Sequence, residues 1–484
     1  MKASQVTFLG WLALITPVLA AQPDFALRAT PAVPAAPDSA IVHAIDTIEP
    51  SRIEKTIDTL VRFGTRSTLS SMDTNLPPGQ GINAAADWIA AQFEEISKQC
   101  GGCLEVRRDT FVAAPGGGGP WANRIPQPTR ITNIYAIQRG TDPAEANRMY
   151  LVTGHYDSRN TNVLDATGAA PGANDDASGV AVSLECARAL SKMRFPATLV
   201  YVAVAGEEQG LFGSAQLARL AREQGWELEA VLNNDIVGGN TTPGDTLQLK
   251  NRVRVFSEGI PAAATPQEIR RIRELGEESD SPSRELARAV ANVARTYFPG
   301  GRSSRFEAFL VFRPDRYWRG GDQSSFNQEG YAAVRFTEWR EDYNHQHQNV
   351  VIPPAGSGKP ILGDLPQFVD FSYVARVARL SAATLASLAS SPGKPQDLKL
   401  VILNRKLSNE TTLSWAPPAG AGAGVRYQVV WRSTAAPEWQ YLKTVAPSAA
   451  GQRITATLPI SMDNVVFGVR SVDALGHQSL TVVP

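Results

Sequence analysis

Two stretches of the sequence, MYLVTGHYD at 149–157 and TLVYVAVAGEEQG at 198–210, share one construction. In each, an apolar run typical of a buried strand is followed by a glycine and then by imidazole or carboxylate side chains. The sequence also predicts helices at 177–190 and 211–222 and a further strand at 228–236. This alternation predicts an α/β fold, a mixed, mostly parallel sheet with helices on both faces.

The same pattern continues outward in both directions along the chain. Further elements are predicted at 82–97 (helix), 131–137 (strand), 253–256 (strand), 281–297 (helix) and 367–388 (helix). We therefore assign residues 41–389 to the α/β domain. Ser, Pro and Gly crowd into 390–396, which we expect to be a linker. Residues 397–484 alternate apolar and polar positions between Pro and Gly turns, which predicts an all-β sandwich.

The N-terminus has the pattern of a secretory signal. Lys2 precedes a mostly apolar run at 8–19, and small residues follow at a plausible cleavage point, so we predict a signal peptide at 1–20. The run is short for a membrane anchor, which is the alternative. Residues 21–40 are rich in Ala and Pro, and we expect an extended leader or a short propeptide. The protein is thus predicted to be secreted, into the extracellular space or a periplasm.

Disulfide bonds form in an oxidising compartment, so the predicted export bears on the three cysteines. Cys100 and Cys103 are separated by two glycines and could close a small loop as a disulfide, whereas a redox motif or half of a zinc site are the alternatives. Cys186 is left over. With 47 basic and 47 acidic residues the formal charge is zero, so the sequence lacks the basic excess typical of nucleic-acid binding.

Candidate chemical groups follow the predicted strands, where open α/β sheets place their ligands. His155 and Asp157 form a His-x-Asp pair, in which a carboxylate could orient an imidazole that binds a metal. A surface histidine beside a turn is the alternative. Asp175 and Asp176 precede the helix at 177–190; Asp176 is a natural helix cap, which leaves Asp175 as a candidate bridging ligand between two cations.

Two further clusters have the same position. Glu207 and Glu208 are paired carboxylates after a strand, an arrangement that is unfavourable unless cations or a proton neutralise it. Asp235 lies at the end of the predicted strand at 228–236, although a turn aspartate is the plain alternative. His345 and His347 supply two of the five histidines, and we expect only one of them to enter the site. Imidazoles and carboxylates in this number suit two zinc-class ions that share a water.

This combination resembles the secreted di-zinc aminopeptidase family, the zinc exopeptidases that share a fold with the transferrin-receptor ectodomain and glutaminyl cyclases. The resemblance covers roughly residues 45–390 and rests on the motifs at 154–157, 172–179, 206–208, 234–235 and 345–347. It implies that 41–389 is a di-zinc peptidase domain. It implies the following roles: His155 and Asp235 on one Zn²⁺, Glu208 and His347 on the other, Asp175 bridging both, and Glu207 as general base.

The resemblance also implies supporting roles. Asp157 would orient His155, Asp176 would shape its turn, and the peptide bond after Asp175 would be cis. Gln323 stands where the family usually has His, so Asp322 is only a candidate for a place behind the ligands. His347 is preferred over His345 as the ligand. The C-terminal residues resemble a fibronectin type III module through TLSW at 412–415 and FGVRSVD at 467–473, and Val465 stands where that family usually has Tyr.

The resemblance implies a secreted metallo-aminopeptidase that removes N-terminal, apolar residues from peptides with a free N-terminus. A carboxypeptidase or a glutaminyl cyclase on the same fold are the alternatives, and a non-catalytic, receptor-like binding protein is a further one. We expect no nucleic-acid partner and no membrane span after signal cleavage. Whether the C-terminal module binds a surface, a polymer or a protein is left open by the sequence.

Overall fold

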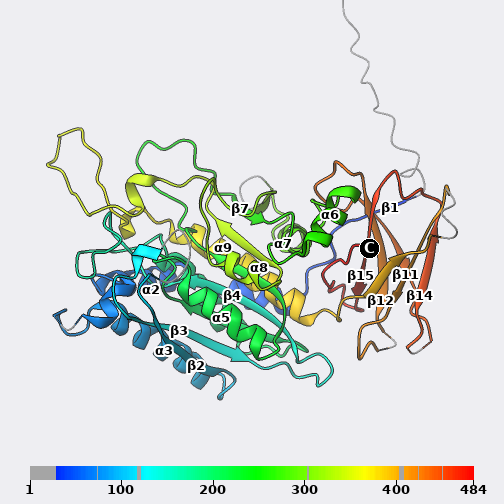
Figure 1. Cartoon of the computed structure of the whole chain (residues 1–484), viewed down its shortest axis with the longest axis horizontal. Coiled ribbons are helices and arrows are strands. Elements are labelled where there is room, and N and C mark those ends of the chain that lie inside the picture. Colours follow the sequence, from blue (N-terminus) through cyan, green and yellow to red (C-terminus); the bar gives the residue numbers. More distant parts are fainter. Residues whose placement is uncertain are drawn as a thin grey trace, which may run out of the picture.

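The computed structural model describes residues 29–73, 75–116, 122–301, 305–402, 408–422, 424–449 and 451–484 of the 484-residue chain. The predicted signal peptide and residues 21–28 of the predicted leader lie outside these ranges. A large α/β part carries a smaller all-β part at one end (Figure 1). Among the described helices, none is long and apolar enough to cross a membrane.

An eight-stranded sheet forms the centre of the α/β part. Its strands are β2 (Glu105–Ala113), β3 (Thr129–Gln138), β4 (Arg148–His155), β5 (Thr198–Val204), β6 (Glu227–Asn234), β7 (Arg252–Ser257), β8 (Glu307–Val311) and β9 (Ala333–Thr337). Their order is β2-β3-β5-β4-β6-β9-β7-β8. The central strands β5, β4, β6 and β9 run parallel, whereas β2 and β3 pair antiparallel at one edge and β7 is antiparallel to β9. The mixed sheet confirms the predicted fold class.

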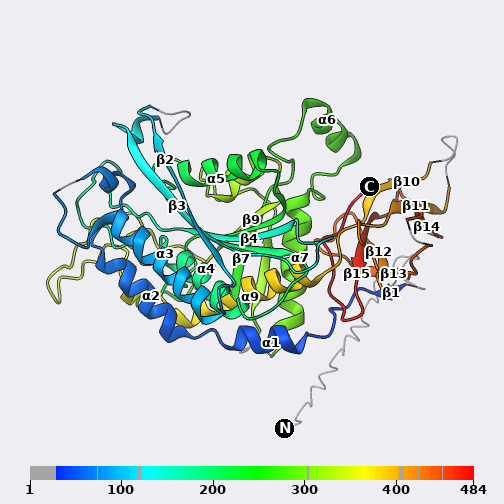
Figure 2. The ribbon, with the colours of Figure 1, turned by 90° about the horizontal axis from the view of Figure 1, so that it is seen from below.

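Helices cover both faces of this sheet (Figure 2). The helices of this part that pack around the sheet are α1 (Ser39–Asp46), α2 (Pro50–Arg62), α3 (Gly81–Gln99), α4 (Ala177–Leu190), α5 (Phe212–Glu223), α7 (Pro282–Tyr297), α8 (Gln323–Gln328) and α9 (Phe371–Ser390). Helix α6 (Pro266–Leu275) lies apart from the sheet and buries no residue. Strand β5 is apolar throughout because it is covered on both faces. Leu199 and Tyr201 pack into the core that contains α4 and α9, whereas Val200 and Val202 pack on the other side against α5 and α8.

The C-terminal part consists of two antiparallel sheets. One has the order β1-β13-β12-β15 and the other β10-β11-β14. The strands are β1 (Thr30–Pro31), β10 (Gln396–Leu400), β11 (Thr411–Ala416), β12 (Arg426–Arg432), β13 (Tyr441–Val445), β14 (Ile454–Leu458) and β15 (Val466–Val472). Trp415, Tyr427 and Trp431 lie buried between the sheets, and Val465 is buried as well. This arrangement is consistent with the predicted fibronectin type III-like sandwich.

The N-terminal segment contributes to the sandwich. Thr30 pairs with Leu442 and Pro31 with Tyr441, so strand β1 extends the edge of the sheet beyond β13. This part of the segment that the sequence suggested as an extended leader therefore belongs to the C-terminal fold. The chain then passes between the two parts and begins α1 at Ser39, where Asp38 caps the helix.

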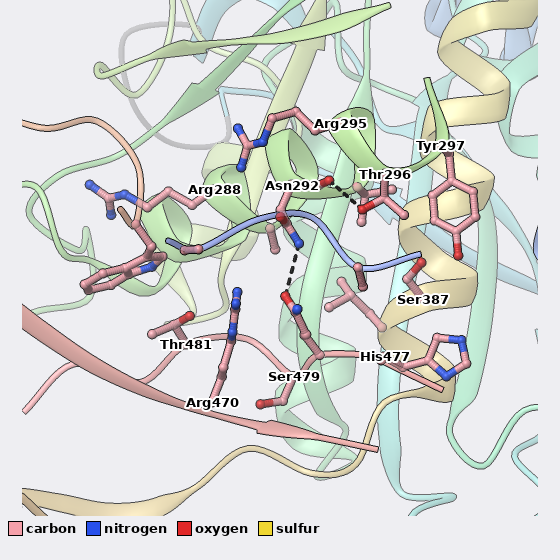
Figure 3. Close-up of a pocket in the computed structure, with 18 of the residues that line it drawn as sticks. Arg288, Asn292, Arg295, Thr296, Tyr297, Ser387, Arg470, His477, Ser479 and Thr481 are labelled. Atoms are coloured by element: carbon pink, nitrogen blue, oxygen red, sulfur yellow. Dashed lines mark hydrogen bonds between the residues drawn. The ribbon is translucent and has the colours of Figure 1, made fainter. Parts of the chain in front are cut away.

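Charged side chains take part in the contact between the two parts. Arg432 of the sandwich forms a buried ion pair with Asp280, and Trp439 donates a hydrogen bond from Nε1 to Glu285 Oε2 at 2.9 Å. A cavity of about 60 Å³ lies beside these contacts, between α7, α9, the N-terminal segment and the sandwich (Figure 3). Across it, Asn292 donates to Gln478 at 3.1 Å. Elsewhere, the predicted disulfide joins Cys100 to Cys103, and Cys186 is free and buried.

Candidate metal centre

The candidate site lies at the carboxyl edge of the central parallel strands. His155 is the last residue of β4, Glu207 and Glu208 follow β5, and Asp235 follows β6. Because β5, β4 and β6 are neighbours in the sheet, these three strand ends bring their side chains to one place. Asp175 joins them from the loop before α4. The strand order thus explains how residues 80 positions apart in the chain share a site.

The side chains form two groups that could each hold a cation. His155, Glu207 and Asp235 make up the first group, and the second consists of Asp175, Glu208 and His347. Within each group the potential ligand atoms lie within 4.8 Å of one another. The second group matches the predicted ligand set, whereas in the first group Glu207 stands where the bridging Asp175 was predicted.

Asp175 connects the two groups. Its Oδ1 lies 3.1 Å from His155 Nε2, and its Oδ2 lies 2.8 Å from His347 Nε2. Each oxygen of this carboxylate therefore faces one group, which is the geometry that a bridging ligand requires. His347 Nε2 is also 2.9 Å from Glu208 Oε1, so both ligands predicted for the second cation lie together.

The chemistry of the donor set fits a zinc-class cation. Imidazole nitrogen and carboxylate oxygen are ligands that Zn²⁺ takes. Two of these atoms, His155 Nε2 and Glu208 Oε1, are buried and make no hydrogen bond within the described structure, although oxygen or nitrogen atoms lie about 3 Å away. Such short distances between ligand atoms, without hydrogen-bond geometry, are expected where the atoms all point toward one shared cation position. A buried polar atom without a partner is otherwise unfavourable.

Asp157 orients His155 and the neighbouring loop. His155 Nδ1 lies 3.1 Å from the Asp157 carbonyl and 3.4 Å from its Oδ1. Asp157 Oδ2 accepts hydrogen bonds from Thr68 Oγ1 at 2.9 Å and from the Glu208 amide at 3.1 Å. One buried carboxylate thus positions an imidazole from β4 and the main chain after β5, leaving His155 Nε2 directed to the site.

Asp176 fixes the start of α4. Its peptide bond with Asp175 is cis, as the resemblance implies. Asp176 Oδ1 accepts from the amide of Gly179 at 2.9 Å and thereby caps the helix, while Oδ2 accepts from the amide of His155 at 3.0 Å. The side chain therefore ties the loop that carries Asp175 to the end of β4. It shapes the turn, and it is absent from both ligand groups.

Only one histidine of the His-x-His pair enters the site, as expected. His345 points away, stacks on Phe368 with ring centroids 3.4 Å apart, and lies 3.0 Å from Thr242 Oγ1 through Nδ1. The segment that carries the two histidines is not extended. Tyr343–His345 forms a 3-10 turn, and His347 has a φ of 56°, so the two rings are separated by a change of chain direction.

Several residues of the site were missed by sequence reasoning. Asp364 accepts the amides of Asn174 at 2.8 Å and Asp175 at 2.7 Å, and so holds the loop of the bridging residue. Arg335 is fully buried and pairs with Asp235 Oδ2 at 2.6 Å. Gln346 donates to Asp175 Oδ2 at 3.0 Å. The proximity of Gln346 to His347 in sequence was a usable signal, whereas Asp364 and Arg335 had none.

Electrostatics in this site are dominated by buried carboxylates. Burial raises the pKa of Glu207 well above its usual range, and Asp235 and Glu208 raise it further against the opposing charge of His155. Burial by itself lowers the pKa of His347, but Glu208 and Asp175 outweigh it and bring the pKa to about 10. Asp322 is buried behind the site, and burial raises its pKa to about 7. The pocket thus holds more negative charge than its own cations neutralise.

An α/β sheet that gathers two His/carboxylate groups around a shared aspartate defines a metal-dependent hydrolase. Comparison with known proteins gives the family. Residues 133–351 match peptidase family M28, and 93% of the chain aligns with curated probable zinc metalloproteases. The chain belongs to this family of zinc metallopeptidases, which act on peptides.

Two relatives and one solved structure show the extent of the similarity. A probable zinc metalloprotease of Pyricularia oryzae is 44% identical over 93% of this chain and 85% of its own. A probable zinc metalloprotease of Leptosphaeria maculans is 41% identical, and the alignment covers 93% of this chain and 97% of that protein. Among solved structures, the Legionella pneumophila aminopeptidase LapA aligns at 19% identity and a TM-score of 0.47, over 74% of this chain and 77% of that one.

Proposed function

We propose that the protein is a secreted aminopeptidase that removes N-terminal residues from peptides with two Zn²⁺ ions. The observation that supports two ions is the position of Asp175, whose two oxygens face separate groups of ligands. His155 and Asp235 would hold one ion, Glu208 and His347 the other, and Asp175 both. Zn²⁺ bound there supplies a Lewis acid for the scissile carbonyl and lowers the pKa of a bound water.

Glu207 is the general base of this proposal. It follows β5 directly beside the ligand Glu208, and its carboxylate lies within reach of the atoms of His155 and Asp235. From there it accepts the proton of the attacking water and returns it to the leaving amine. Asp157 keeps His155 and the main chain of Glu208 in place while charge develops. Each of these residues comes from a strand end, which limits their movement.

The preference for a free N-terminus follows from the proposed metal site. Asp175, Glu207, Glu208 and Asp235 form the floor of the pocket, and Zn²⁺ held there would supply a Lewis acid for the free α-amine of the substrate. An N-acetylated peptide lacks a basic amine and is expected to bind poorly. Export is supported by the predicted signal peptide and by the Cys100–Cys103 disulfide.

The test is cleavage of amino-acid anilides by the purified full chain. Leucine anilide and N-acetyl-leucine anilide are compared, before and after chelation, and bound zinc is counted by elemental analysis. We expect cleavage of the free-amine substrate only, loss on chelation, recovery with zinc, and two ions per chain. Release of the C-terminal residue from an N-acetylated dipeptide with a free carboxyl terminus would favour a carboxypeptidase, and cyclisation of N-terminal glutamine with one ion would favour a glutaminyl cyclase.

A further inference from the structure

Arginines surround the pocket that contains the metal ligands. The pocket has a volume of about 220 Å³, and its wall includes Arg124, Arg159, Arg316 and Arg319. Leu211 and Trp318 are the large apolar side chains in the same wall, and Trp318 is 89% exposed. This composition differs from the apolar wall that the predicted preference for apolar N-terminal residues requires.

Two of the four arginines are neutralised by the protein itself. Arg316 lies 2.9 Å from Asp315 Oδ1 and 2.7 Å from Glu341 Oε2. Arg319 lies 3.0 Å from the same Glu341 oxygen. Their guanidinium groups are held by buried carboxylates, so these side chains build the wall of the pocket on the Gly320 side.

Arg159 is different. It is half-buried, and its hydrogen bonds go to the main-chain carbonyls of Asn160 at 3.1 Å and Thr161 at 3.2 Å, within its own loop. Over the described ranges, no carboxylate oxygen lies within 4.0 Å of its guanidinium nitrogens. A half-buried cation in a substrate pocket, satisfied only in part by neutral oxygens, retains the capacity to bind an anion.

Arg124 stands close to Arg159. Its Nη1 donates to the carbonyl of Glu208 at 2.7 Å, which places it at the second ligand group. Burial lowers the pKa of Arg124, and the neighbouring charge of Arg159 lowers it further, so the two cations interact. Two divalent cations would balance the four carboxylates of the pocket floor, and the charges of this arginine pair would then attract an anionic group of the substrate.

We propose that Arg159, together with Arg124, binds a carboxylate of the peptide substrate, so that the enzyme prefers acidic substrates. This inference rests on the proposed peptidase function and specifies its substrate class. A planar guanidinium binds a carboxylate through two parallel hydrogen bonds, which suits both discrimination and orientation. The carboxylate has two possible sources: the side chain of an N-terminal Glu or Asp, or the carboxyl terminus of a short peptide.

Matched substrate pairs separate these sources. Glutamate anilide and glutamine anilide differ only in the charge of the side chain, and Leu-Gly and its C-terminal amide differ only at the carboxyl terminus. We expect the zinc-loaded full chain to favour one acidic member by roughly 10- to 100-fold in kcat/KM, the range for a hydrogen-bonded ion pair. The pair that shows the preference identifies the source.

The variants Arg159→Gln and Arg159→Lys test the residue. We expect Arg159→Gln to reduce the acidic preference to near unity, chiefly through KM, and Arg159→Lys to retain part of it. Arg219→Gln is the matched control, since Arg219 is exposed on α5, donates a hydrogen bond to Gln216 Oε1 and does not line the pocket. Equal rates on both members of both pairs, or the same preference in Arg159→Gln as in the unmodified chain, would overturn the proposal.

Binding separates this proposal from the proposed function. Calorimetric titration of the zinc-loaded chain with D-glutamate and D-glutamine, and with D-leucylglycine and its amide, measures recognition without cleavage. If no anilide or dipeptide is cleaved but one acidic ligand binds more tightly through Arg159, the aminopeptidase assignment fails and the carboxylate site stands. If the neutral substrates are cleaved and neither acidic ligand gains from Arg159, the function stands and the carboxylate site is wrong.

Discussion

Two regions of the molecule bury charged side chains, and they treat that charge differently. At the contact between the α/β part and the sandwich, Arg432 pairs with Asp280, and His477 lies between Asp473 and Asp38. At the metal centre, carboxylates from two strand ends and one loop meet with two imidazoles and one fully buried arginine, Arg335. These interface side chains have oppositely charged partners within the protein, whereas the metal centre leaves an excess of negative charge.

Buried charge therefore has a structural role at the interface and a chemical role at the metal centre. A buried ion pair that is closed within the protein needs nothing from solution, and its removal affects stability. A buried group of carboxylates without enough cations requires one from solution, and its removal affects the reaction. The comparison therefore predicts that changes at one region affect activity and metal content, while changes at the other affect unfolding.

The largest effect is expected from removal of the metal. Chelation should reduce aminopeptidase activity by roughly 10³-fold or more, because several kcal/mol of transition-state stabilisation are lost. It should also lower the melting temperature, since repulsion among Asp175, Glu208 and Asp235 is no longer screened by cations. Elemental analysis and thermal unfolding measure both effects. Full activity of a chain shown to contain no metal would contradict the claim that the buried carboxylates of this centre require cations from solution.

The next effect distinguishes the two neighbouring glutamates. Glu207→Gln should lower kcat by about 10²- to 10⁴-fold, the range for loss of a general base, while the chain keeps two ions. Glu208→Gln should lower the metal content instead, since Glu208 Oε1 lies beside His347.

Metal content and kcat of the two variants, measured side by side, test this assignment. Because the structure places Glu207 within reach of the first ligand group, loss of one ion in Glu207→Gln would mean that this residue is a ligand rather than the base.

At the interface, Asp280→Ala should destabilise the protein without affecting the reaction. It leaves Arg432 buried without its carboxylate, which costs about 3–5 kcal/mol in the free energy of unfolding. Urea unfolding provides the measurement, and Asp463→Ala on an exposed turn of the sandwich is the control. A change in metal content in Asp280→Ala would show that the two regions are not independent.

The sequence predicted most of the site because the signal is local in the chain. Helix α4 and strand β5 have the predicted bounds, and the ends of β4, β5 and β6 carry the predicted ligands. These predictions need only the period of an element and the rule that ligands gather at one edge of a parallel sheet. His347 lies with Asp175 and Glu208, in a chain conformation that the sequence did not predict.

What the sequence did not predict depends on contacts between distant segments. Asp364 supports Asp175 from 189 positions away, and Arg335 supports Asp235 from a neighbouring strand. A lone Asp in a loop and a lone Arg in a strand have no pattern of their own. Likewise, the pairing of Thr30–Pro31 with β13 requires two ends of the chain to meet, and nothing in the composition of residues 21–40 indicates the partner.

The smallest effect concerns pH at the interface. His477 lies 2.8 Å from Asp473 through Nδ1 and 3.1 Å from Asp38 through Nε2. Burial by itself lowers the pKa of His477, but the two carboxylates outweigh it, so the pKa is raised above its usual value. The effect is small because the Asp473 and Asp38 side chains remain 26% and 19% exposed.

The sign of the dependence follows from that shift. A histidine with a raised pKa binds its proton more tightly in the folded state, so its contribution to stability is complete below the unfolded pKa of about 6.5. The contribution is lost as the pH rises through the higher folded pKa. Urea unfolding of the full chain and of His477→Gln between pH 5.5 and 9 should therefore show the largest difference at the acidic end and a shrinking difference above it. A difference that stays constant with pH would mean that His477 contributes by packing alone, and the interface would then not depend on this charge.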